Sequence, residues 1–188
     1  MNMKMNPSHS SMFMALPLLV VAVLACSGSI GNETVKANKL VEEGNAAVQE
    51  GKKYVEDAEE KKDKMLHTKV SQLAEARTLA KEAIAAYDKA QEKCKEAAKK
   101  YDEASKLKIS DKFKEYLALK VKEYNKRAEV METAKATPQA LLDSESQKSF
   151  ITRAKANNEK IDALAKEAED LAGQSDKLQK DNPDIFKW

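Results

Sequence analysis

The sequence predicts an all-α protein, an antiparallel bundle of three to four long helices with coiled-coil-like, alanine-rich seams. Charged residues make up 34% of the 188 residues, and Ala, Glu and Lys dominate, a composition typical of long helices and coiled coils. Small and apolar residues recur every three or four positions over long stretches, and no stretch shows the alternation of a β-strand. We therefore expect one helical domain over residues 33–180.

The first predicted helix covers residues 33–66 and buries one face. Ala37, Gly44, Gly51 and Ala58 lie seven residues apart on that face. An interior glycine costs a helix about 1 kcal/mol relative to alanine. Two of them in one stripe therefore indicate that a neighbouring helix approaches closely.

The second predicted helix covers residues 68–105 and carries the most regular seam. No Gly or Pro separates it from the first helix, so a single continuous rod is the alternative. A shift in the phase of the stripe between Lys61 and Thr68, with Thr68 as a possible cap, favours a hairpin turn. The seam residues are Leu73, Ala76, Ala80, Ala83, Tyr87, Ala90, Cys94, Ala97, Tyr101 and Ala104.

The third predicted helix begins after Ser110, a favourable N-cap, with Asp111 at its positive end. It is expected to stop at Thr137–Pro138, because the residue before a proline avoids helical angles. Residues 138–142 are expected to form at most a short helical turn. The predicted buried face consists of Phe113, Leu117, Val121, Tyr124, Ala128 and Met131.

The last predicted helix starts at Ser144 and ends at Asp181–Asn182–Pro183. Residues 181–188 form a C-terminal tail in which Phe186 and Trp188 either close the end of the bundle or dock a protein partner. The predicted inward positions are Ile151, Ala154, Ile161, Leu164, Ala168, Leu171 and Leu178.

Residues 12–26 form the only uncharged, continuously apolar stretch of the chain. A stretch this short does not span a bilayer as a helix, which takes about 20 residues. It follows a weakly basic start with Lys4, and this arrangement is typical of a signal peptide, here residues 1–25.

The sequence Val23-Leu24-Ala25-Cys26 resembles the lipobox of bacterial lipoproteins. The resemblance covers the export signal alone. It implies that the chain is cut before Cys26, that Cys26 is acylated, and that residues 26–32 tether the bundle to a membrane of the cell envelope, such as the outer membrane. Ordinary cleavage after Ser27 is the alternative and would give a soluble secreted protein.

Composition argues against several function classes. The chain carries 33 basic and 31 acidic residues, and removal of residues 1–25 leaves 32 against 31, so nothing attracts nucleic acid. After Cys26 only Cys94 remains, on a seam, where a free cysteine acts as a small buried hydrophobe. His67 shares a helix face with Glu59 and Asp63, but we interpret this face as solvated. We expect no enzyme activity, no cofactor and no metal.

Charge is unevenly distributed along the chain. Residues 93–127 hold twelve bases against six acids, whereas residues 32–63 hold nine acids against six bases, and residues 157–184 hold eight against four. The simplest interpretation is that oppositely charged helices lie side by side. A sharper hypothesis is a basic tip that touches anionic lipid or a polymer, formed by Lys106, Lys108, Lys112, Phe113 and Lys114.

The sequence therefore predicts a non-enzymatic, lipid-anchored helical bundle of the cell envelope that acts as a scaffold, a spacer or a partner-binding module. Its partners would be the membrane, through the acyl chains, and a protein or a second copy. The alternative function is a soluble secreted helical protein that binds lipid or a small apolar ligand.

Overall fold

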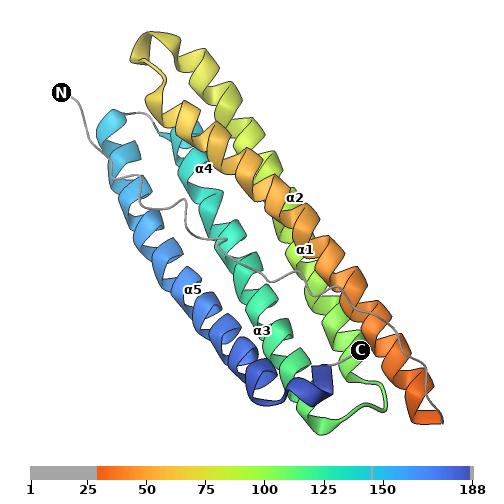
Figure 1. The fold of residues 1–188 in the computed structure, drawn as a ribbon. Coiled ribbons are helices and arrows are strands. Elements are labelled where there is room, and N and C mark those ends of the chain that lie inside the picture. Colours follow the sequence, from red (N-terminus) through yellow and green to blue (C-terminus); the bar gives the residue numbers. More distant parts are fainter. Residues whose placement is uncertain (1–28, 145, 187–188) are drawn as a thin grey trace.

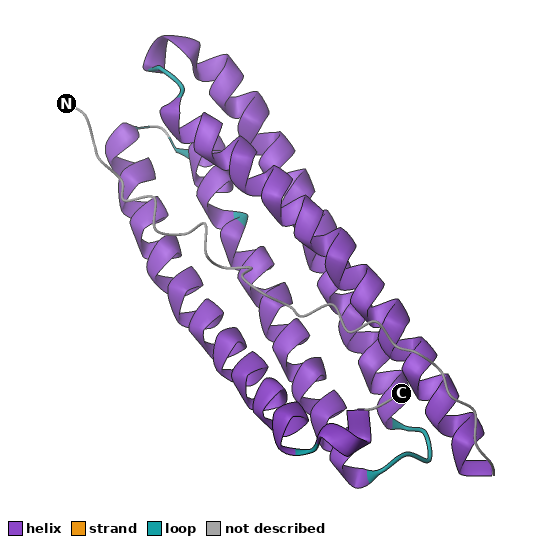
Figure 2. Ribbon diagram, in the orientation of Figure 1, coloured by secondary structure: helices purple, strands orange, loops and turns teal. Residues whose placement is uncertain are grey.

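The computed structural model describes residues 29–144 and 146–186, and within them every regular element is helical, with short loops between the helices (Figure 2). The predicted all-α class is confirmed. The elements are α1 (Ser29–His67), η1 (Val70–Gln72), α2 (Leu73–Ser105), α3 (Asp111–Ala134), α4 (Ala136–Asp143), α5 (Gln147–Asp181) and η2 (Pro183–Phe186), where η marks a 3-10 helix.

The long helices pack in the order α1, α2, α3, α5, each antiparallel to the next (Figure 1). The short helix α4 continues the path of α3 and contacts α2 and α5. Among the described residues, α1 and α5 make no comparable contact with each other and lie at opposite edges of the molecule (Figure 1). The bundle is therefore open, because a closed four-helix bundle would bring its first and last helices together.

A turn separates α1 from α2, so the predicted hairpin is confirmed. The predicted role of Thr68 as the cap of the second helix is wrong. Its hydroxyl donates to the carbonyl of Lys64 at 2.8 Å and thereby satisfies a free carbonyl at the end of α1. The helix α2 starts only at Leu73, after the short helix η1.

The start of α1 also differs from the prediction. The helix begins at Ser29, so residues 29–32, which we assigned to a tether, belong to it. The stretch Ser29–Asn32 contains no proline, and its one glycine is tolerated in a helix of 39 residues.

The glycine stripe of α1 lies against α2, as predicted. A methyl group added at Gly44 would lie 2.9 Å from the ring of Tyr101, and one at Gly51 would lie 3.1 Å from Cβ of Lys93. The hydroxyl of Tyr101 donates to Oδ1 of Asn45 at 2.7 Å across the same seam. The small residues therefore bring the two helices close together.

The start of α3 agrees with the prediction, because Oγ of Ser110 accepts a hydrogen bond from the backbone N–H of Phe113 at 3.3 Å. Its end does not. The helical path only turns at Lys135 and then continues as α4 through Pro138. Pro138 is the third residue of α4, where the backbone N–H has no partner within the helix and a proline is tolerated.

The last long helix starts later than predicted. Ser144 ends α4, and the cap of α5 is Ser146, whose Oγ accepts from the N–H of Ser149 at 3.3 Å. The sequence offers three serines within six residues, at 144, 146 and 149. Each of them is a plausible cap, and only the packing of α4 selects one.

The core forms three clusters along the bundle, rich in alanine and filled by a few rings. Tyr87, Tyr101 and Tyr124 are almost fully buried. The predicted burial of two residues is wrong, because Leu73 is 44% exposed and Ile151 is 37% exposed. Both lie in the first two turns of their helices.

Candidate functional site

The start of α1, the α2–α3 turn and η2 lie at one end of the bundle, called here the Ser29 end (Figure 1). Hydrogen bonding by Lys36 chiefly lowers the pKa of the Glu33 carboxyl. A hydrogen bond from the backbone of Lys108 and the charge of Lys108 lower it further, which places the turn beside the start of α1. The predicted basic tip therefore lies at the Ser29 end, and Ser29 is only three residues after Cys26 in the sequence.

Three of the four lysines of this tip lie beside carboxylates. Lys106 Nζ lies 2.6 Å from Asp102, and Lys112 Nζ lies 2.7 Å from Glu115. The charge of Lys108 acts on Glu33 of α1, which also pairs with Lys36.

Phe113 does not contribute to an exposed surface. It is only 2% exposed and packs in the core cluster nearest the Ser29 end. Its backbone carries the cap contact with Ser110, and its ring lies 6.3 Å from that of Tyr116. The prediction that Phe113 belongs to a lipid-contacting tip is therefore wrong, and contact by the four lysines stays a prediction.

A buried charged cluster on α3 was missed by the sequence analysis. It consists of Lys120, Glu123 and Arg127. The Glu123 carboxylate is fully buried and accepts from Lys120 Nζ at 2.7 Å and from Arg127 Nε at 2.8 Å. Lys120 itself is only 4% exposed. Charged groups that are shielded from water need partners of opposite charge, and these two ion pairs supply them.

Aromatic rings surround the charged cluster. Lys120 Nζ lies 5.3 Å and the Arg127 guanidinium 5.8 Å from the centre of the Tyr124 ring, within the range of cation–π attraction. The Tyr124 ring also packs against that of Tyr101, with centres 5.6 Å apart. The buried hydroxyl of Tyr124 has no hydrogen-bond partner among the described residues. Burial, and then the charge of Glu123, raise the pKa of Tyr124, so the phenol stays neutral.

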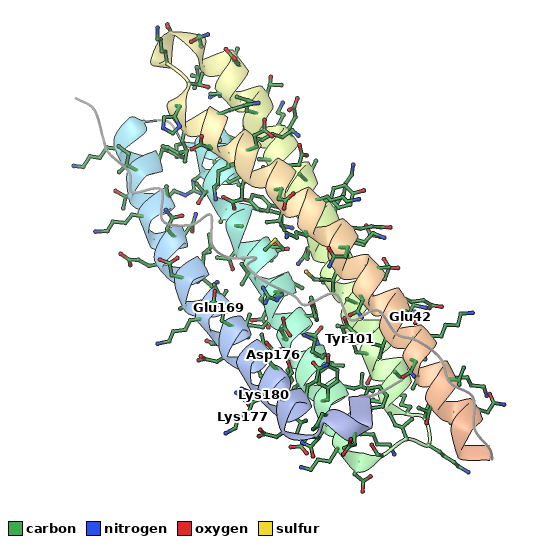
Figure 3. The ribbon with its side chains drawn as sticks, viewed as in Figure 1. Glu42, Tyr101, Glu169, Asp176, Lys177 and Lys180 are labelled. Atoms are coloured by element: carbon green, nitrogen blue, oxygen red, sulfur yellow. The ribbon has the colours of Figure 1, made fainter. Side chains whose placement is uncertain are left out.

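The charged cluster lies on the part of α3 between its α2 side and its α5 side. The charges of Glu123 and Arg127 act on Cys94 of α2. Tyr116 and Lys126 flank Glu123 on the same face of α3, seven residues before it and three after it. Lys126 Nζ lies 3.1 Å from Glu167 of α5, and the charge of Asp176 of α5 acts on Tyr116. Both acids belong to α5, and Asp176 lies on its C-terminal half (Figure 3).

A signal for this cluster was present in the sequence. Lys120, Glu123 and Arg127 have the spacing of helical ion pairs, and they follow Leu117 along the stripe of the third helix. We did not predict the cluster because charged residues are usually exposed, and these three were therefore assigned to the solvent side of the helix.

Cys94 lies on the seam as predicted and is buried. Burial chiefly raises the pKa of its thiol to about 11. A thiol in this state carries little thiolate at neutral pH, so it is a poor nucleophile. The interpretation of Cys94 as a small buried hydrophobe is confirmed.

His67 is exposed at the end of α1, and its Nδ1 lies 3.3 Å from Oδ1 of Asp63. Glu59 is occupied elsewhere, because it pairs with Lys62 and accepts from the hydroxyl of Tyr87. Within the described ranges, no group of three or more His, Cys, Asp or Glu side chains is arranged to hold a metal ion.

Three predicted site residues cannot be placed. Cys26 and Trp188 lie outside the described residues, and so does the side chain of Phe186. The neighbouring Ile185 packs against the core cluster of the Ser29 end, so this part of the tail covers the end of the bundle. None of the described helices combines the length and the apolar character needed to cross a membrane.

Comparison of the chain with protein-family models, with curated proteins and with solved structures found no match.

Proposed function

We propose that this chain is a non-enzymatic, lipid-anchored spacer of a bacterial cell envelope, attached through acyl chains on Cys26. The main support is the position at which α1 begins. Only residues 27 and 28 separate Cys26 from Ser29, the first residue of the helix. Three extended peptide steps cover at most about 11 Å, so an anchor at Cys26 would hold the Ser29 end beside the bilayer.

The length of the hairpin supports a spacer. At 1.5 Å per residue the 39 residues of α1 extend about 58 Å. The close seam with α2 stiffens this rod, and cross-helix pairs such as Glu43–Lys100 and Glu50–Lys93 keep it in register. A protein partner or a second copy would then be met far from the bilayer, near the α1–α2 turn.

Metabolic labelling with palmitate tests the anchor. We expect the native chain to take up label and to sediment with membranes, and Cys26→Ala to do neither. The four lysines of the tip remain in this variant, so the same comparison measures what they contribute. An unlabelled native chain found in the medium would instead favour the soluble secreted protein.

Energy transfer to a dye in the bilayer tests the spacer. Lys69→Cys at the α1–α2 turn and Lys108→Cys at the α2–α3 turn are both exposed and form a matched pair on a Cys94→Ala background. The 33 residues of α2 between the two turns predict that the first label is about 50 Å farther from the membrane. Equal transfer from the two labels would show that the bundle lies flat.

A further inference from the structure

Helix α5 has fewer buried residues than α1, α2 or α3. Of its 35 residues, only Ala154, Ala168 and Ser175 have described side chains that are buried. In α2, with 33 residues, eleven side chains are buried, including two tyrosines. The larger apolar residues of α5 are only half-buried. These residues are Phe150, Ile161, Leu164, Leu171 and Leu178. Detachment of α5 therefore exposes little additional apolar surface of this helix to water.

The contact between α5 and α3 has a charged part and an apolar part. Lys126 of α3 pairs with Glu167 of α5, whereas Ile161 and Leu164 of α5 pack against the core cluster that contains Val130 of α3. The ion pair of Lys126 with Glu167 and the charge of Asp176 near Tyr116 indicate an antiparallel register. The ten-residue step from Tyr116 to Lys126 along α3 runs beside the nine-residue step from Asp176 back to Glu167 along α5. In this register Glu123 lies opposite the segment around Ala168, which is 1% exposed. Ala165 and Ala172 share the face of Ala168, and these small side chains leave room for Lys120 and Arg127.

We propose that α5 is a separately opening arm, which detaches from α3 as a unit and hydrates the buried Lys120–Glu123–Arg127 cluster. Burial of three charges costs desolvation free energy, which their mutual attraction offsets only in part. Opening recovers this hydration while the α1–α2–α3 core stays folded, because α1 does not rest on α5. The open form presents Lys120 and Arg127 on the uncovered face of α3.

Amide hydrogen exchange of the full chain, read peptide by peptide, tests the arm. We expect peptides of α5 to exchange at least tenfold faster than peptides of α1 and α2 after correction for intrinsic rates. Equal protection of the three helices would overturn the proposal, because it would show one cooperative unit.

Two variants separate the arm from the core. Ala46→Gly lowers the helix propensity of α1 at an exposed position and is expected to accelerate exchange in α1 and α2 at least threefold, with α5 unchanged. Ala168→Leu overpacks the α3–α5 contact and is expected to accelerate α5 at least threefold, whereas Ala163→Leu, on the exposed side of α5, serves as its control. Parallel acceleration of α5 by Ala46→Gly would contradict the arm.

Replacement of the charged cluster tests the cause of opening. The triple variant Lys120→Met, Glu123→Met, Arg127→Met removes the hydration gained by the open form. We expect exchange of α5 to slow at least tenfold. Unchanged or faster exchange of α5 in this variant would show that opening does not expose the cluster. The two variants of the preceding test decide the existence of the arm even if this triple variant does not fold.

Discussion

At the scale of single residues, two glycines in α1 set the distance between the first two helices. Gly44 faces the ring of Tyr101, and Gly51 faces Cβ of Lys93, in both cases nearer than an ordinary methyl contact allows. Gly173, by contrast, lies on the exposed side of α5, and a Cβ added there would have no neighbouring atom within 4 Å. The same residue type therefore has opposite consequences at the two places.

Substitution of Gly44 by alanine is expected to destabilise the protein. Overpacking of this kind costs about 1–3 kcal/mol, and the higher helix propensity of alanine offsets about 1 kcal/mol of it. We expect a net loss of about 1 kcal/mol in the free energy of unfolding. Urea denaturation followed by circular dichroism measures this change.

Gly173→Ala is the matched control for Gly44→Ala. It gains the same helix propensity without a contact to strain, so its free energy of unfolding should rise by up to about 1 kcal/mol. If both substitutions stabilise the protein, the seam between α1 and α2 yields to a methyl group, and the close approach does not depend on glycine.

The residue scale also shows why sequence reasoning failed at Glu123. The burial of Cys94 and the contact at Gly44 follow from periodicity, because small side chains on a regular stripe have few other roles. Glu123 breaks the usual link between residue type and burial. It is buried because Lys120 and Arg127 reach it along the same helix, so that each of its two carboxylate oxygens has a positively charged partner.

At the scale of helices, the cap at Ser110 was predictable, whereas the start of α2, the start of α5 and the continuation of α3 into α4 were not. Ser110 is the N-cap that its sequence suggests, since Asp111 follows it and the apolar stripe begins with Phe113. Pro138 was read as a stop, but α4 begins just before it, so the proline needs no donor there. A single sequence does not distinguish these two positions of a proline.

Ser110→Ala is expected to lower the free energy of unfolding by about 1 kcal/mol. The Ser110 hydroxyl oxygen accepts from the N–H of Phe113, and alanine would leave that donor at the start of α3 without its cap. Thermal denaturation measures the loss. Ser110→Asp should retain most of the stability, because aspartate caps equally well.

Ser71→Ala is the control for the cap, since Ser71 is exposed in η1 and caps none of the long helices. It should change the free energy of unfolding by less than about 0.5 kcal/mol. An equal loss in both serine variants would show that the cap of α3 contributes nothing specific.

At the scale of the whole molecule, opposite charges lie on neighbouring helices as the uneven charge distribution predicted. Glu43 and Glu50 of α1 meet Lys100 and Lys93 of α2, and Glu167 of α5 meets Lys126 of α3. Each exposed pair contributes well under 1 kcal/mol. Together they favour this order of helices over one that places like charges side by side.

The open order of the helices could not be predicted from the sequence. Periodicity shows which face of a helix is buried, but it does not show which helix covers that face. Half-buried residues such as Leu164 and Leu171 read as core positions in the sequence, although α5 touches one long neighbour only. The difference between a closed and an open bundle therefore became visible only in the structure.

The overall dimensions give a direct test of this architecture. A compact globule of about 160 residues has a radius of gyration of about 15 Å. With a helix about 58 Å long at one edge, the open bundle should instead have a radius of gyration of about 20 Å. Small-angle X-ray scattering of a Cys26→Ala protein that lacks residues 1–25 measures it. A value near 15 Å would mean that α1 and α5 do not extend as described, whereas a value far above 25 Å would indicate end-to-end association of copies or an unfolded α1–α2 turn.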